Sequence, residues 1–214
     1  MVPDLQWILV GLPAFILAGT VHEYMHAWTA KKLGDYTATI EGRLTLNPLA
    51  HLDPFGLLLM IIAKFGWMKP VPVNSYNFKN PVVGMAITAL AGPASNLVMA
   101  TAAAIVYNAL FAQQFLALLP SSSPVLGVLN SALISFIYVN IVLMLFNLIP
   151  IPPLDGSRIV KVIMPKSLQY YWDLMENYSG ILLLLILLPF SPLSQVIGTF
   201  LTSGILYFMN LLIL

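Results

Sequence analysis

Long apolar segments separated by a few charged residues constrain this chain more than any other feature. Hydrophobic residues make up 59% of the 214 residues and charged residues only 8%, whereas roughly a quarter of a soluble protein is charged. So few charges cannot cover a water-exposed surface, and the apolar surplus must therefore face lipid. Five segments are long enough, or nearly so, to cross about 30 Å of hydrocarbon. They lie near 5–28, 82–112, 126–149, 172–190 and 193–214.

A shorter apolar run at 55–67 has 13 residues and is too short to span a bilayer. All nine Lys and Arg residues fall within 31–79 and 158–166, and both windows are therefore cytoplasmic by the positive-inside rule. If 55–67 crossed the membrane, Lys69 and Lys79 would lie outside. The charge pattern thus predicts a re-entrant segment that enters and leaves from the cytoplasmic face.

Polar and apolar side chains alternate from Thr37 to Leu46, between the first span and this run. A period of two with several threonines is typical of a β-strand or a tight hairpin. The predicted fold is therefore an all-α membrane protein. It is a polytopic helical bundle of about five spans plus a re-entrant segment, with a small cytoplasmic-side β element, and residues 1–214 form a single domain.

The first span ends in the sequence His22-Glu23-Tyr24-Met25-His26. Positions i and i+4 share one face of a helix, so both imidazoles can reach one metal ion. Glu23 can then act as a general base beside that metal. Ionisable residues inside a membrane are costly and usually functional. The alternative is a pair of histidines at a helix end that extend to the interface beside Lys31.

A catalytic zinc site needs a third protein ligand. Downstream of the motif the candidates are few: Asp35, His51, Asp53, Asp155 and Asp173. Asp155 follows a segment with three prolines in four residues, 150–153, which breaks the helix at the cytoplasmic end of the third span. Because the His22 and His26 turn lies at the same side, we predict Asp155 as the third ligand. The alternative is a turn aspartate that caps the helix beginning at Ser157.

Asn147 and His51 are the next candidates. Asn147 lies eight residues before Asp155 at the end of an apolar helix. Its amide is suited to donate to the oxyanion that forms when water attacks a carbonyl, although an interhelical hydrogen bond is the alternative. His51 lies in a proline-bounded loop. A fourth protein ligand would close a catalytic site, which favours a loop hydrogen bond or an inhibitory contact for His51.

Several stretches together resemble the site-2 protease family of intramembrane zinc metalloproteases, in the compact form without PDZ or CBS domains. The matching stretches are HEYMH at 22–26, GRLTLNPLAHLDP at 42–54, GWMKPVPVN at 66–74, AGPASN at 91–96 and NLIPIPPLDGSR at 147–158. The resemblance implies that His22, His26 and Asp155 bind one Zn²⁺ per chain. It implies that Glu23 is the catalytic base, and it points to Asn147 as a further catalytic residue. We interpret AGPASN as packing around the site.

The resemblance further implies hydrolysis of peptide bonds within the transmembrane segments of other membrane proteins, as in regulated intramembrane proteolysis. The expected partners are single-span membrane protein substrates and lipid. No basic run suggests nucleic acid. The expected location is the cell membrane of a prokaryote, with the active site towards the cytoplasm. The edge of the predicted strand at 37–46 offers pairing groups to an unwound substrate. The alternatives are a membrane metal transporter or a non-catalytic helix-binding scaffold, neither of which needs Glu23.

Overall fold

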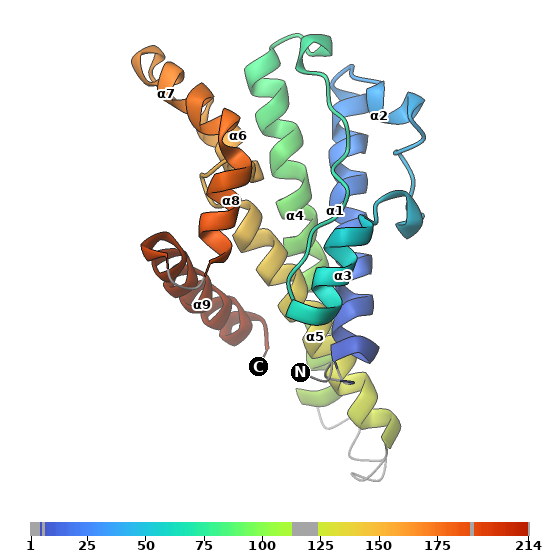
Figure 1. The fold of residues 1–214 in the computed structure, drawn as a ribbon. Helices are drawn as coiled ribbons and strands as arrows, with labels where there is room; N and C mark the ends of the chain where they lie inside the picture. Colours follow the sequence, from blue (N-terminus) through green and yellow to red (C-terminus); the bar gives the residue numbers. More distant parts are fainter. Residues whose placement is uncertain (1–4, 6, 113–123, 189–190, 214) are drawn as a thin grey trace.

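The computed structural model describes residues 5, 7–112, 124–188 and 191–213, which form a bundle of helices (Figure 1). The long helices are α1 (Leu12–Lys32), α4 (Pro81–Tyr107), α5 (Pro124–Asn147) and α9 (Pro192–Leu212). The shorter α-helices are α2 (Thr37–Ile40), α3 (Pro54–Ala63), α6 (Asp155–Val160), α7 (Lys166–Asn177) and α8 (Ser179–Leu187). Single turns of other helix types are η1 (Trp7–Gly11), η2 (Pro48–Ala50), η3 (Ser75–Asn77) and η4 (Asn108–Ala112).

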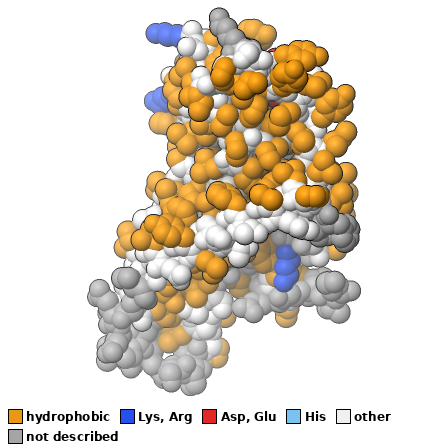
Figure 2. Space-filling model, turned by 90° about the vertical axis from the view of Figure 1, so that its left-hand side faces the viewer, with side chains coloured by type: hydrophobic (Ala, Val, Ile, Leu, Met, Phe, Trp, Pro, Cys, Tyr) orange, Lys and Arg blue, Asp and Glu red, His pale blue; other side chains and the backbone are white. Residues whose placement is uncertain are grey.

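Four of the helical segments in the described part of the chain are long and apolar enough to cross a membrane. They are Trp7–Lys32, Pro81–Phe111, Pro124–Asn147 and Pro192–Leu212, and they match four of the five predicted spans. The face that carries α7, α8 and α9 is covered mainly by hydrophobic side chains (Figure 2). A surface of this kind is suited to lipid, and the chain is an integral membrane protein.

The remaining predicted span, at 172–190, does not form one long helix among the described residues. It contributes to α7 and α8, which meet at Tyr178. Lys161 pairs with Asp173 and Glu176 at 3.0 Å each, which ties the polar face of α7 to the turn after α6. At a rise of about 1.5 Å per residue, the nine residues of α8 are too short to span hydrocarbon alone.

The core that positions the site lies where α1, α4 and α5 pack together. Small side chains of α4, at Ala100, Ala103 and Ala104, face Ile137 and Ile141 of α5 in one buried cluster. Small residues allow helix axes to approach closely, which is how membrane helices gain packing energy. Ala14, Phe15 and Ala18 of α1 pack with Val139 of α5 in a second buried cluster, so α1, α4 and α5 are held together around their buried polar side chains.

The predicted re-entrant segment turns back on itself. Helix α3 occupies its first part and ends at Ala63, and Lys64 adopts a left-handed conformation at the helix end. The chain then returns, so that Leu52 and Met68 form an isolated antiparallel bridge. Because the two ends of the segment meet, the chain enters and leaves α3 on one side of the bundle, a path compatible with the predicted re-entrant segment.

The predicted β element is wrong, since no strand occurs in the described residues. The segment that begins at Thr37 forms the short helix α2. Asp35 accepts hydrogen bonds from both the backbone N–H and the hydroxyl of Thr37, which fixes a turn in place of an extended chain. Gly42 follows with a φ of 69°, a conformation that ends the helical turn and that side chains other than glycine rarely adopt.

Candidate metal centre

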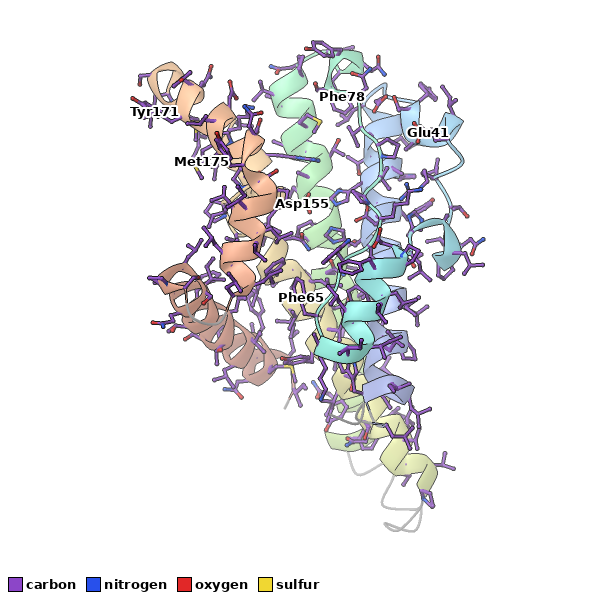
Figure 3. All side chains as sticks on the ribbon, viewed as in Figure 1. Glu41, Phe65, Phe78, Asp155, Tyr171 and Met175 are labelled. Carbon is purple, nitrogen blue, oxygen red and sulfur yellow. The ribbon has the colours of Figure 1, made fainter. Side chains whose placement is uncertain are left out.

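The first two predicted ligands lie one turn apart on α1. His22 and His26 are both buried, and their Nε2 atoms are 2.9 Å apart. Asp155 is the first residue of α6 and reaches them because the proline-containing loop after α5 turns the chain back towards α1. Its Oδ2 lies 3.2 Å from Nε2 of His22 and 3.3 Å from Nε2 of His26. Asp155 is labelled at the centre of the bundle in Figure 3.

The spacing of these three atoms fits a zinc ion. Ligands held at about 2.0–2.1 Å in a tetrahedral site lie about 3.3 Å apart, which matches the separations of 3.2, 3.3 and 2.9 Å. The buried Oδ2 of Asp155 also makes no hydrogen bond within the described part of the chain. A buried carboxylate oxygen without a donor is costly unless a cation satisfies it. His22, His26 and Asp155 therefore suit a catalytic zinc site with one open position.

The other ring nitrogens of the two histidines are engaged by α4. His26 Nδ1 lies 2.7 Å from the backbone carbonyl of Thr88, which can only accept, so this nitrogen carries the proton. His22 Nδ1 lies 2.6 Å from the side-chain oxygen of Asn96. Such outer hydrogen bonds orient the rings and direct Nε2 towards a metal.

Gly92 allows α4 to approach the two imidazoles. A Cβ at this position would lie 2.5 Å from Nε2 of His26 and 2.6 Å from Nε2 of His22. Both distances are shorter than real side-chain contacts, so any larger residue would displace the rings. Gly92 and Asn96 are thus the two residues of AGPASN that contact the imidazoles: Gly92 by leaving them room and Asn96 by its hydrogen bond to His22. This arrangement agrees with the predicted role of the stretch in packing around the site.

Glu23, which lies between the two histidines in sequence, is held by a different segment. Its Oε2 accepts a hydrogen bond of 2.9 Å from the backbone N–H of Val71. Val71 belongs to an extended stretch, residues 67–74, that follows the return of the chain from α3 and leads towards α4 (Figure 1). This hydrogen bond orients the Glu23 carboxylate near the two imidazoles, and one potential ligand atom from each of His22, Glu23 and His26 lies within 4.8 Å of the other two.

The extended stretch is fixed at both ends. Lys69 N–H donates to the carbonyl of His51 at 2.8 Å, and Asn74 N–H donates to Asp35 Oδ2 at 2.8 Å. Burial alone would raise the pKa of Asp35, but the hydrogen bonds from Thr37, Asn77 and Asn74 hold it below its ordinary value. A charged anchor thus keeps the stretch that carries Val71 in place.

The predicted functional residues line one cavity. It has a volume of about 370 Å³, and its lining includes the five predicted site residues His22, Glu23, His26, Asn147 and Asp155. Asn147 is the last residue of α5 and donates through Nδ2 to the carbonyl of Leu143 at 2.9 Å. An amide has two N–H groups, so one donor of Asn147 remains for a ligand in the cavity.

The other predicted ligand candidates are engaged elsewhere. His51 is fully buried, and its Nε2 lies 2.8 Å from the carbonyl of Thr45, which agrees with the predicted loop hydrogen bond. Asp53 caps α3 by accepting from Gly56 N–H at 2.7 Å. Asp173 pairs with Lys161. Of the downstream acids and histidines in the described residues, Asp155 is the one whose side chain contacts both motif histidines.

Two further residues near the site escaped the sequence interpretation. Arg158 lines the cavity and also a second one of about 420 Å³ that reaches Lys161 and Ser179. In the sequence, Arg158 served only as part of the basic window 158–166 that indicates the cytoplasmic side. Val71 contributes a backbone N–H, which cannot be predicted from residue type because nearly every residue has one. It does lie in the matching stretch at 66–74.

Two buried imidazoles and a carboxylate, with a glutamate beside them and membrane-spanning helices around them, are typical of a zinc metalloprotease held in a membrane. Comparison with known proteins agrees. Residues 117–187 match the family model described as Peptidase family M50. The Bacillus subtilis protein YwhC, whose name describes a zinc metalloprotease, is 40% identical over 196 residues, which cover 88% of this chain and 84% of YwhC. The chain belongs to peptidase family M50, the family of the site-2 proteases.

Two mycobacterial relatives share the same kind of name. Rip2 of Mycolicibacterium smegmatis, also named as a zinc metalloprotease, is 32% identical over 156 residues, covering 69% of this chain and 56% of Rip2. Rip2 of Mycobacterium tuberculosis H37Rv is 28% identical over 155 residues, covering 68% of this chain and 56% of that protein. This chain thus spans a little over half the length of Rip2. No solved structure matches the chain.

Proposed function

We propose that this zinc metalloprotease hydrolyses peptide bonds within the transmembrane segments of other membrane proteins. One observation carries the proposal: Glu23 and the three candidate ligand atoms line a single cavity among helices that are long and apolar enough to cross a membrane. His22, Glu23 and His26 lie on the candidate span Trp7–Lys32, which supports a site at membrane depth. A protease with this placement acts on substrates that are themselves in the bilayer.

In the proposed mechanism, five side chains and one metal ion each have a role. His22, His26 and Asp155 would hold Zn²⁺, which supplies Lewis acidity to polarise the scissile carbonyl and to make water acidic. Glu23, oriented by Val71 N–H, accepts the proton of the attacking water and delivers it to the leaving amine. Asn147 donates its remaining N–H to the developing oxyanion.

The proposed substrate is a single transmembrane helix of another protein, as in regulated intramembrane proteolysis. A helix pairs its backbone groups internally, so the scissile carbonyl becomes reachable only after local unwinding. The zinc-loaded protein in detergent, given a panel of single-span proteins, should produce cuts that mass spectrometry places inside the apolar segment. Cuts confined to soluble loops would contradict the proposal.

A membrane metal transporter is the alternative from a different class, and a non-catalytic helix-binding scaffold is another. Both would use the same cavity, but neither explains why a backbone N–H orients Glu23 beside the ligand atoms. Zinc flux into proteoliposomes tests the transporter directly. Flux that persists in the absence of any proteolysis would favour it.

We also propose that the metal centre faces the cytoplasmic side of a prokaryotic cell membrane. The proposal rests on the two basic windows at 31–79 and 158–166 and on the return of the chain after α3. The chain has no cysteine, so single cysteines introduced for Lys31 and Asn74 are unique labels. Both should be protected from an impermeant thiol reagent applied outside intact cells. Labelling at position 74 but not at 31 would show that the segment between them crosses the membrane.

Asn147→Ala should lower kcat by about 100- to 1,000-fold, the usual loss when one oxyanion donor is removed. Zinc content should not change, because Asn147 is bonded to Leu143 and not to a candidate ligand. Cleavage rates at matched zinc content check the expectation. A kcat equal to that of the unchanged protein would assign Asn147 to helix packing.

A further inference from the structure

A chain of hydrogen bonds links His22 to the backbone of α5 through two buried asparagines. Asn96 of α4 and Asn140 of α5 are both fully buried. Asn96 Oδ1 lies 2.6 Å from His22 Nδ1, and Asn96 Nδ2 donates to Asn140 Oδ1 at 2.9 Å. Asn140 Nδ2 in turn donates to the carbonyl of Phe136 at 2.8 Å. Burying an amide costs free energy unless its N–H and C=O groups form hydrogen bonds. Here each amide bonds to the next group along the chain of hydrogen bonds.

The direction of this chain is set at its far end. A backbone carbonyl can only accept a hydrogen bond, so the amide group of Asn140 that faces Phe136 must be the NH₂. Its oxygen therefore faces Asn96. The group of Asn96 that meets this oxygen must in turn be the NH₂, which also lies 3.3 Å from the carbonyl of Ala18. Two backbone carbonyls on different helices thus demand the same orientation of Asn96.

This orientation determines the tautomer of His22. Asn96 presents its oxygen to Nδ1, so Nδ1 must carry the proton and Nε2 must carry the lone pair. His26 also carries its proton on Nδ1, because the Thr88 carbonyl accepts a hydrogen bond from that nitrogen directly. Two lone pairs and the carboxylate oxygen of Asp155 then converge within 2.9–3.3 Å. No donor hydrogen of these groups is left to point between them, and a cation satisfies all three.

We propose that Asn96 and Asn140 are positioning residues for metal binding, which act through the tautomer and orientation of His22. The inference rests on the proposed ligand set. His26 relies on a carbonyl that cannot rotate, whereas His22 relies on two side-chain amides that can. We call the hydrogen bonds from Asn140 through Asn96 to His22 the relay. A substitution of Asn140 on α5 therefore changes the orientation of His22 on α1, although Asn140 does not contact the metal site.

The test measures zinc affinity by competition with a chelator for purified protein in detergent. Asn96→Leu should lower the affinity about 10- to 100-fold, as is usual when the outer partner of a metal-bound histidine is lost. Asn140→Leu should lower it less, roughly threefold to tenfold, because Ala18 still holds Asn96 weakly. The matched control is Ser95→Ala, which removes a local hydrogen bond to Gly92 next to Asn96 and should bind zinc like the unchanged protein.

A second readout separates positioning from packing. In protein loaded with Co²⁺, the exchangeable ring N–H protons of bound histidines are shifted far from other signals in NMR. The His22 signal should exchange faster in Asn96→Leu and Asn140→Leu, while the His26 signal, held by Thr88, stays unchanged. If no shifted signal disappears in His22→Ala, the proposed ligand set fails, whatever the asparagines do.

Equal zinc affinity and unaltered His22 exchange in both asparagine variants would overturn the relay. Equal losses in Ser95→Ala would also overturn it, because they would assign the effect to general packing on α4. If Asn96→Leu does not fold, Asn140→Leu carries the test, since its position is one hydrogen bond farther from the metal and an apolar side chain of similar size can fill it.

Discussion

Glu23→Gln should abolish proteolysis while the protein keeps its zinc and its fold. The three candidate ligands are untouched, and the side-chain oxygen of glutamine can still accept the hydrogen bond that Val71 N–H donates at 2.9 Å. The extended stretch over the site is therefore retained. Only the proton acceptor is lost, because an amide oxygen is not basic. Loss of general-base catalysis costs about 100- to 10,000-fold.

The measurement is the initial rate of cleavage of a single-span substrate, with zinc determined by elemental analysis on the same sample. Glu41→Gln is the matched control. It makes the same chemical change at an exposed residue after α2 and should leave the rate within twofold, as surface changes rarely matter more. Undiminished proteolysis by Glu23→Gln would rule out the proposed mechanism.

The residues that were predictable from sequence are those whose placement depends on local chain geometry. His22 and His26 share a face because a helix has 3.6 residues per turn, whatever surrounds it. Asp155 was predictable because the prolines at 150–153 prevent α5 from continuing. The loop that follows α5 then lies at the same level of the bundle as the histidines of α1. In both cases the short-range rule and the tertiary contact agree.

The predicted β element failed because two local preferences competed. Alternation of polar and apolar residues from Thr37 onwards favours a strand. Asp35 instead accepts from the backbone and side chain of Thr37 and also from Asn74 and Asn77, which lie far along the chain. A buried carboxylate with four donors outweighs the small intrinsic preference of a short strand that has no partner strand.

The contacts that complete the site could not be predicted from one sequence. Asn96 bonds to His22 across 74 positions in the chain, and the contact exists only because Gly92 lets α4 approach α1 closely. The register of α4 against α1 and α5 is set by packing, and no local pattern encodes it. The donor from Val71 is a backbone group, so its role follows from the path of the return after α3.

Asp155→Ala should remove most of the bound zinc. Among the described acids downstream of the motif, Asp155 is the one that contacts both motif histidines, at 3.2 and 3.3 Å. Two imidazoles alone leave a catalytic zinc site short of a ligand. Loss of an outer partner already costs about 10- to 100-fold in affinity, and loss of a direct ligand should exceed that. Elemental analysis and chelator competition on purified protein measure the effect.

The control for this change is Asp173→Ala, which removes an exposed carboxylate paired with Lys161. A surface pair contributes at most about 1 kcal/mol, so this variant should fold and retain full zinc. His22→Ala and His26→Ala should lose zinc as Asp155→Ala does. Full zinc in Asp155→Ala would refute the ligand set. His51 and Asp53, the remaining alternatives, would then have to leave the Thr45 carbonyl and the cap of α3 to reach the metal.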